Sequence, residues 1–346
     1  MQRRSMRFAL LAVALTATIV AVALVRNART PRIYAFDGRT MGSTWSARVV
    51  GPADLDTAAT RAAIEGKLAE LDDALSNYRE TAELYRFNHA PVGEPFAIST
   101  HLANVIRFGL ELNRDSDGAF DPTVKPLVDL WGFGAAPPRT SLPRDDEIAA
   151  ARARLGSAAL IFAADGTALT RAADVNVDVD AIGPGYAADV VAALLTARKL
   201  PDHLVEIGGE VHVDGRRPDG SAWRVGIELP ERARTGFQAV VALAAGGLST
   251  SGDYRDYFEI DGKRYSHTLD PSTGRPVEHA LTSVTVIADD TLEADGYATA
   301  VMVMGPERGM AWADAHGLPV YMLVRQADGT TAVKCNDRFA PFLRAQ

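Results

Sequence analysis

A carboxylate and a hydroxyl four residues apart could together bind a divalent cation. Asp295 and Thr299 lie in a segment whose pattern predicts a helix, and residues four apart share one helix face. Carboxylate and hydroxyl oxygens suit a hard cation such as Mg²⁺, which takes its other ligands from backbone, water or substrate phosphate. Pairs with this spacing also cap helices or bond locally, so the spacing alone leaves both interpretations open.

One histidine stands where it could transfer a proton. His267 ends a predicted strand and precedes the turn that contains Pro271, although an ordinary strand-end histidine would look the same. The seven histidines contain no H-x-H, H-E-x-x-H or His/Cys pairing. The sequence therefore predicts no zinc site.

Residues 183–188, Gly-Pro-Gly-Tyr-Ala-Ala, match the dinucleotide-binding pattern G-x-G-x-x-A. The first strand of such a fold is buried on both faces and should be continuously apolar. Here Asn176, Asp178 and Asp180 place a polar stripe along the preceding segment. The pattern is therefore a poor indicator of a dinucleotide fold, but a glycine-containing helix start remains a suitable phosphate site.

The elements that must position these groups mix helices with short strands. Helices are expected over residues 57–75, 99–113, 145–156, 183–198 and 290–305, and another is expected to end near Gly317. Strands are expected over residues 35–50 with a break at 41–43, and over 175–180, 203–207, 211–213, 223–229, 237–244, 257–260, 263–266 and 283–288. Residues 126–138 are expected to form a loop, and a last hairpin turns at residues 328–329.

Hairpins interspersed with helices predict an α+β fold with mixed or antiparallel sheets and packed helices, rather than a doubly wound sheet. No interdomain linker follows residue 34, so residues 34–346 are expected to form a single domain. The net charge of −8 disfavours a nucleic-acid partner, which would require a basic face. The single cysteine, Cys335, permits no intrachain disulfide.

The N-terminus has the features of an export signal. An uncharged run of 18 residues, 8–25, follows Arg3, Arg4 and Arg7 and precedes Arg26, and this length is at the short limit for crossing a bilayer. No cysteine lies there, so the chain is not a lipoprotein. Residues 1–33 are expected to be a signal anchor or a cleaved signal peptide, which places the remainder at the periplasmic side of the inner membrane, or in the periplasm.

Eight blocks in order resemble the ApbE family, the FAD:protein FMN transferases. The resemblance runs from about Met41 to Tyr321. The blocks are Met41-Gly42-Ser43-Thr44, Leu75-Ser76-Asn77-Tyr78, residues 118–124, 131–134, 183–189, 206–210, 249–274 and 294–300.

The resemblance implies Mg²⁺-dependent transfer of FMN from FAD to a threonine hydroxyl of an acceptor protein, with release of AMP. It implies that Asp295 and Thr299 are metal ligands, with backbone oxygens of Ala181 and Ala298, and that Asp295 and His267 are catalytic. The residues implied to contact the FAD are Met41, Tyr78, Ala119, Phe120, Asp121, Asp178, Pro184 and Leu269.

The chain departs from the family at one position of the predicted helix start. Many members have a lysine where this chain has Pro184, which removes one cation near the pyrophosphate. By resemblance, the acceptors include flavin subunits of membrane redox pumps. Two alternatives would use the same site: an FAD-binding or storage protein, and a pyrophosphatase that hydrolyses FAD to FMN and AMP.

Overall fold

The computed structural model describes residues 31–134, 141–229, 236–253 and 257–344. Most of the predicted leader, residues 1–30, lies outside these ranges, as do residues 135–138 of the predicted loop and Tyr254 of the longest family block. Within the described ranges, no helix is both long enough and apolar enough to cross a membrane.

The predicted helices are present, with two additions, and the helix expected over residues 145–156 ends already at Arg152. Asp56, Ser99 and Asp290 each accept a hydrogen bond from a backbone N–H in the first turn of the helix that follows. The helices are α2 (Thr57–Leu75), α3 (Glu83–His89), α4 (Thr100–Asp115), α5 (Lys125–Trp131), α6 (Asp145–Arg152), α7 (Gly183–Ala197), α8 (Thr291–Met304) and α9 (Pro306–Ala315).

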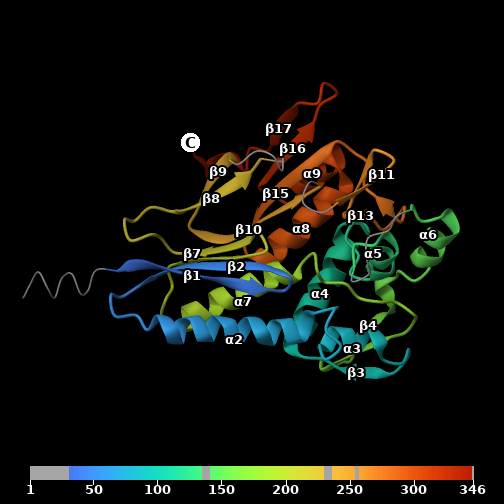
Figure 1. Cartoon of the computed structure of the whole chain (residues 1–346), viewed down its shortest axis with the longest axis horizontal. Helices are drawn as coiled ribbons and strands as arrows, with labels where there is room; N and C mark the ends of the chain where they lie inside the picture. Colours follow the sequence, from blue (N-terminus) through green and yellow to red (C-terminus); the bar gives the residue numbers. More distant parts are fainter. Residues whose placement is uncertain (1–30, 135–140, 230–235, 254–256, 345–346) are drawn as a thin grey trace, which may run out of the picture.

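An eight-stranded antiparallel sheet forms the centre of the fold (Figure 1). Its order is β1 (Arg32–Thr40), β2 (Ser43–Gly51), β6 (His203–Ile207), β7 (Glu210–Asp214), β10 (Ala245–Gly252), β15 (Leu281–Ala288), β16 (Val320–Arg325) and β17 (Thr331–Cys335). Helices α7 and α8 pack on one face, and α2 packs against α7. The α+β prediction with antiparallel sheets is thus confirmed.

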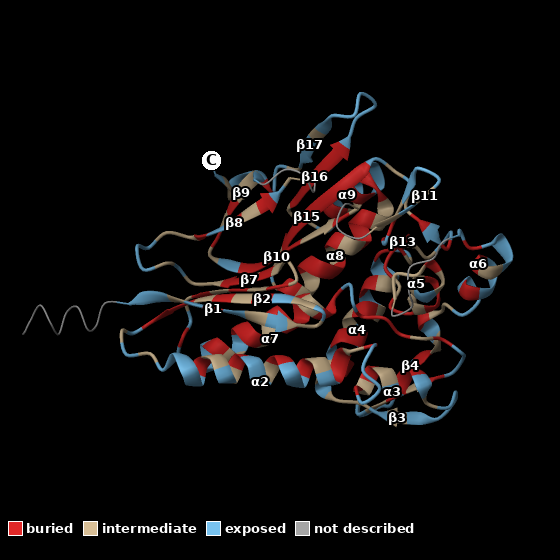
Figure 2. Ribbon diagram, viewed as in Figure 1, coloured by how far each residue is buried: buried red, intermediate tan, exposed pale blue. Residues whose placement is uncertain are grey.

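Among the described residues, four smaller sheets accompany the large one, two of three strands and two of two strands. One sheet lies against the face of the large sheet opposite the helices and shares a buried core with it. Figure 2 shows β15, β16 and much of α8 buried between the layers. The smaller elements are β8 (Trp223–Glu228), β9 (Phe237–Leu243) and β18 (Leu343–Arg344); β3 (Pro95–Ala97), β4 (Leu160–Phe162) and β5 (Ala168–Arg171); β11 (Tyr257–Ile260) and β12 (Lys263–Ser266); and β13 (Leu269–Asp270) and β14 (Arg275–Pro276).

The expected loop over residues 126–138 is wrong at its start, because α5 occupies Lys125–Trp131. Pro126 stands in the first turn, where a helix does not need the missing N–H. Leu127 and Trp131, four residues apart, bury the same helix face. Gly132 then ends the helix with a φ of 79°.

The expected strand over residues 175–180 is also wrong. Val175, Val177 and Val179 are buried as the alternation predicts. The segment forms no ladder, because the N–H of Val177 donates to the side chain of Asn88 and that of Asp178 to the carbonyl of Pro122. One isolated bridge, from Asn176 to Val124, takes the place of the strand.

Candidate active site

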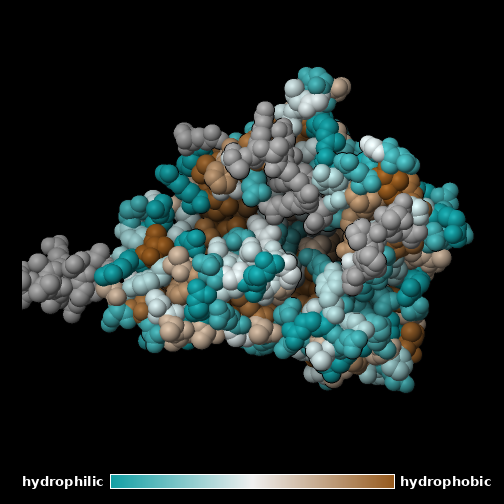
Figure 3. Space-filling model, viewed as in Figure 1, coloured by the Kyte–Doolittle hydropathy of each residue, from teal (hydrophilic) through white to brown (hydrophobic). Residues whose placement is uncertain are grey.

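A cleft of about 620 Å³ lies beside β10 and α8. The view in Figure 3 shows this face of the molecule hollowed near its middle. Sequence positions more than 200 residues apart, such as Ser43 and Thr299, contribute to its lining. The predicted site residues that line it are Tyr78, Ala119, Phe120, Asp121, Asp178, Ala181, Pro184, His267, Leu269, Asp295 and Thr299.

Two predicted site residues are not among those that line the cleft. Met41 has a φ of 48° in the turn between β1 and β2 and packs against the main core. Ala298 is fully buried in the core between α8, β15 and β16. The roles expected for these two residues stay predictions.

Asp295 is a buried carboxylate with fixed hydrogen-bond donors. Its side chain is 5% exposed, and it accepts from the N–H of Gly185 at 3.1 Å and from the Ser249 hydroxyl at 3.2 Å. Burial raises the pKa of Asp295 well above its ordinary value, and the nearby charge of Glu210 raises it further. A cation at this point would relieve both the burial and the like-charge repulsion.

Thr299 lies one helical turn beyond Asp295, and both side chains line the cleft, as the shared helix face predicts. Its hydroxyl is 3.4 Å from the Ser251 hydroxyl on β10. A carboxylate and hydroxyls are the donors that a hard cation prefers. These residues therefore fit Mg²⁺ better than a cation that requires nitrogen or sulfur ligands.

The dinucleotide-like pattern of residues 183–188 reflects packing, because the contact between α7 and α8 requires a glycine at position 185. A Cβ at this position would lie 2.5 Å from the carbonyl oxygen of Thr291 and 2.8 Å from the Cβ of Asp295. The glycine lets the start of α7 approach α8 closely enough for its N–H to reach the Asp295 carboxylate. The positive end of the α7 dipole thus faces Asp295, and only the adjacent Pro184 side of the turn lines the cleft.

A second acidic group lies on the wall formed by residues 178–181. Asp178 is 7% exposed, and burial with the neighbouring charge of Asp180 raises its pKa to about 8. The Tyr78 hydroxyl donates to Asp180 at 2.6 Å, and the N–H of Asp180 donates to Asp178 at 2.9 Å. Partial burial, then Asp180, raise the pKa of Tyr78, so the phenol keeps its proton.

Asp121 braces the wall through its own side chain. One carboxylate oxygen accepts from the N–H and hydroxyl of Thr123, at 2.8 and 2.6 Å, and from the hydroxyl of Ser157 at 2.8 Å. These bonds fix the turn at residues 121–123 and join it to Ser157, directly after Ala119 and Phe120, which line the cleft. The carboxylate therefore positions backbone.

His267 borders an aromatic wall, which we define as Trp131, Phe133, Phe258 and Tyr265. The His267 ring is exposed and lies edge-on to Phe133, with ring centroids 6.3 Å apart. The indole of Trp131 donates to the carbonyl of Gly274 at 2.8 Å, which ties the turn after His267 to α5. The wall thus holds the imidazole at the mouth of the cleft.

Two acidic residues of the site received no role from the sequence. Glu210 and Asp180 line the cleft and act on Asp295 and Tyr78. Glu210 stands directly after Gly208-Gly209, and that tight turn was the available signal. The signal for Asp180 was its spacing of two from Asp178. Neither feature of the sequence predicts which distant side chain Glu210 or Asp180 contacts.

The chain belongs to the ApbE family, whose profile matches residues 41–322. It is similar to a protein named FAD:protein FMN transferase from Vibrio cholerae, at 41% identity over 88% of this chain and 91% of that protein. A solved Flavin Transferase ApbE from Vibrio cholerae superposes with a TM-score of 0.83 at 39% identity, covering 90% of this chain and all of that one. The apo flavinyl transferase ApbE of Pseudomonas stutzeri gives a TM-score of 0.82 at 41% identity, covering 91% and 98%. This chain is therefore a transferase of that family.

Proposed function

We propose that this enzyme transfers FMN from FAD to a threonine hydroxyl of an acceptor protein, releases AMP and requires Mg²⁺. The observation that carries the proposal is the buried carboxylate of Asp295 beside Glu210 in the wall of the cleft. Two acidic groups so close together would need a cation to neutralise the charge of a pyrophosphate while its phosphorus is attacked. The names of the relatives support a flavin substrate.

The metal would be held by Asp295 and Thr299 with the backbone of Ala181. When bound, Mg²⁺ would neutralise pyrophosphate charge as the phosphorus is attacked. Asp295 is held in place by Gly185 and Ser249, so the chain supplies a fixed ligand at no cost in reorganisation. Tyr78, whose hydroxyl donates to Asp180, lines the same cleft and would contact the FAD.

The transfer exchanges one phosphorus–oxygen bond for another. The threonine oxygen forms a bond to the phosphorus on the FMN side, and the bond to the AMP oxygen breaks. The threonine proton must leave as this happens, and His267 at the cleft mouth is the group that would accept it. The exposed position of His267 suits an acceptor that approaches from solvent.

The acceptor would meet the enzyme outside the cytoplasm. The basic residues and the uncharged run of residues 8–25 support export to the periplasmic side of the inner membrane, with or without cleavage of the leader. Acceptors of the expected kind are flavin subunits of membrane redox pumps. The net charge of −8 disfavours nucleic acid as a partner.

Intact-protein mass measurement tests the proposal. The enzyme is incubated with FAD, Mg²⁺ and a candidate acceptor, and the acceptor should gain the mass of one FMN unit while AMP appears. Excess chelator or Asp295→Asn should lower the rate at least about a hundredfold with little loss of FAD affinity. Asp54→Asn, at an exposed acid on the loop before α2, is the matched control and should retain the parent rate.

The same assay separates the alternatives. FMN and AMP without a modified acceptor would indicate a pyrophosphatase. FAD that is bound and recovered unchanged with every acceptor would indicate a storage protein. Full transfer in excess chelator would remove the metal from the mechanism.

A further inference from the structure

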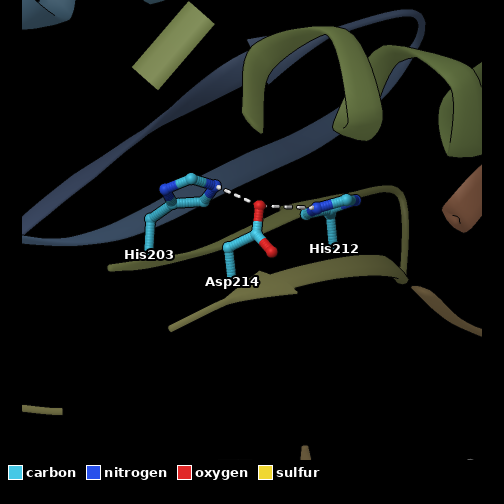
Figure 4. Close-up of side chains that lie close together, drawn as sticks. All are labelled: His203, His212 and Asp214. Carbon is cyan, nitrogen blue, oxygen red and sulfur yellow. Dashed lines mark hydrogen bonds and ion pairs between the residues drawn. The ribbon is translucent and has the colours of Figure 1, made fainter. Parts of the chain in front are cut away.

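Two histidines and an aspartate meet on adjacent strands away from the cleft. In the β6–β7 hairpin, His203 pairs with Asp214 and Val205 pairs with His212. Because alternate residues of a strand share a face, all three side chains point to the same side of the sheet. Figure 4 shows the two rings on either side of the Asp214 carboxylate. One ligand atom from each lies within 4.8 Å of the others.

The His203 ring has one nitrogen committed and one aimed into this cluster. Its Nδ1 lies 2.8 Å from the carbonyl oxygen of Leu200, so Nδ1 must carry the proton that donates. Its Nε2 makes no hydrogen bond, although the side chain is 0% exposed. This Nε2 lies 3.7 Å from Oδ2 of Asp214. Burial lowers the pKa of His203, which favours a neutral ring with a bare lone pair on Nε2.

The His212 ring is oriented in the same way by a different partner. Its Nδ1 lies 2.6 Å from Oδ1 of Asp189 on α7, and its Nε2 lies 3.4 Å from Oδ2 of Asp214. A carboxylate or carbonyl on the far nitrogen is the usual partner of a metal-bound imidazole. Both histidines therefore have the outer hydrogen bond that fixes the ring, with the other nitrogen directed at one point.

The two contacts to Asp214 have lengths that suit a shared ion. A charge-assisted N–H···O bond is about 2.8 Å long, and the Asp189 contact, at 2.6 Å, is of that short kind. The contacts of 3.4 and 3.7 Å to Asp214 are not. Ligands on a tetrahedral zinc ion stand about 3.3 Å apart, given zinc–ligand bonds of about 2.0–2.1 Å.

We propose that His203, His212 and Asp214 form a second metal site, which binds a zinc-class transition-metal ion through two imidazole nitrogens and one carboxylate oxygen. Imidazole ligands favour zinc over Mg²⁺, so this site is chemically distinct from the oxygen donors of Asp295 and Thr299 in the cleft. Asp214 is 41% exposed on its side chain, which leaves an entry path and room for a fourth ligand from water.

A protonated His212 between Asp189 and Asp214 is the competing arrangement. Burial opposes that charge, while Asp189 and Asp214 favour it, and together they raise the pKa of His212. That arrangement would employ both nitrogens of His212 without a metal. It leaves the buried Nε2 of His203 without a partner, which a shared ion would satisfy.

The site is joined to the start of α8. Asp189 also accepts from the N–H groups of Thr291 and Leu292, both at 2.8 Å. Its carboxylate therefore links His212 on β7 to the helix that carries Asp295. An ion here would tie β6 and β7 together and hold this link in place, which is a structural role.

Zinc titration of the full chain tests the proposal. The metal-stripped protein is titrated with Zn²⁺ in excess Mg²⁺ against a chromophoric chelator. We expect one bound equivalent in the parent chain and in Asp295→Asn, which separates the site from the cleft. Asp214→Asn should weaken binding more than about a hundredfold, beyond the effect typical of an outer partner. His316→Gln, at an exposed histidine after α9, is the matched control and should bind like the parent chain.

Two further readouts keep the proposal falsifiable if a variant folds poorly. Co²⁺ bound to the parent chain should give the strong visible bands of a tetrahedral site. Saturating Zn²⁺ should raise the melting temperature of the parent chain by about 5 °C at a hundredfold excess over Kd. The proposal is overturned if the parent chain binds no zinc, if Asp214→Asn binds it equally well, or if Asp295→Asn abolishes it.

Discussion

Burial in the cleft disfavours the negative charge of two carboxylates, and a proton or a cation can compensate for it. Asp295 and Asp178 both have a raised pKa because burial disfavours their charge, and each has an acidic neighbour that raises it further. Without a counter-ion, a carboxyl group with a raised pKa keeps its proton to a higher pH. A divalent cation bound to Asp295 would take the place of that proton, so metal binding should release protons.

Asp178 should make the stability of the protein depend on pH. Its folded pKa of about 8 lies above the unfolded value, so the folded state binds the extra proton between about pH 4 and 8. Stability should therefore fall as pH rises through this window. Asp178→Asn should remove that fall. Between pH 5 and pH 9, the free energy of unfolding of the variant should therefore rise by about 2–4 kcal/mol relative to that of the parent chain. Denaturant unfolding at both pH values, without divalent cations, measures the difference.

Asp54→Asn is the control for this measurement, because Asp54 is exposed and its substitution should leave the pH profile unchanged. Parallel profiles for Asp178→Asn and the parent chain would show that Asp178 ionises normally.

His267 provides the test of proton transfer. His267→Asn should lower the transfer rate by about a hundred- to ten-thousand-fold, because an amide cannot accept the threonine proton. FAD affinity and melting temperature should stay near parent values, since the ring is exposed. Stopped-time mass measurement of the acceptor gives the rate, and fluorescence titration gives the affinity.

A structural role for His267 predicts a different pattern. In that case the stability, the FAD affinity and the rate would fall together. A variant that flavinylates its acceptor at the parent rate would leave metal and positioning as the whole mechanism.

Local spacing predicted the pair on α8 and could not predict its neighbours. Asp295 and Thr299 share a face because a helix fixes residues four apart, whatever the fold. Glu210 reaches Asp295 only through the order of strands in the sheet. His203 and His212 likewise meet through hairpin register, so their sequence spacing matches no zinc pattern. Contacts set by topology are not encoded at short range.

At the scale of the elements, the contact between α7 and α8 sets the geometry of the cleft. Gly185→Ala should place a Cβ against the Thr291 carbonyl and the Asp295 side chain, neither of which can move easily. We expect a loss of about 1–3 kcal/mol of stability and a larger Mg²⁺ requirement for activity. Thermal unfolding and Mg²⁺ titration of the transfer rate measure the two effects.

Gly66→Ala is the matched control. Gly66 lies within α2, and a Cβ there meets nothing within 4 Å. That change should stabilise the chain by about 0.5–1 kcal/mol, because alanine is the better helix former. Equal behaviour of the two variants would contradict the close approach of α7 to α8.

Elements were predictable where pattern and hydrogen bonding agree. The helices capped by Asp56, Ser99 and Asp290 were predicted close to their observed ends. The segment of residues 175–180 has the strand pattern of burial without a strand, because its N–H groups bond to a side chain and a loop. Strand β10 was not predicted, since glycines and hydroxyl residues give it no apolar alternation.

Layering explains, at the scale of the whole molecule, why the site can be both rigid and open. The large sheet is covered by helices on one face and by a small sheet on the other, so the α8 side of the cleft rests on a deep core. The opposite wall rests on a small core around α5 and the aromatic wall. A long substrate can therefore lie between a fixed, acidic side and an aromatic side.

Export is a prediction for the whole chain. A helix of 18 residues is about 27 Å long, close to the bilayer core of about 30 Å, and basic residues stand on both sides of the run of residues 8–25. A phosphatase reporter that is active only outside the cytoplasm, fused after Gln346, should be active in a bacterial host. The same fusion starting at Ile33 should be inactive, because it lacks the apolar run and its preceding arginines.

Fractionation then decides between an anchor, which stays with the membrane, and a cleaved leader, which releases a lighter soluble protein. A full-length fusion active only with a cytoplasmic reporter would place the enzyme, and its acceptor, inside the cell.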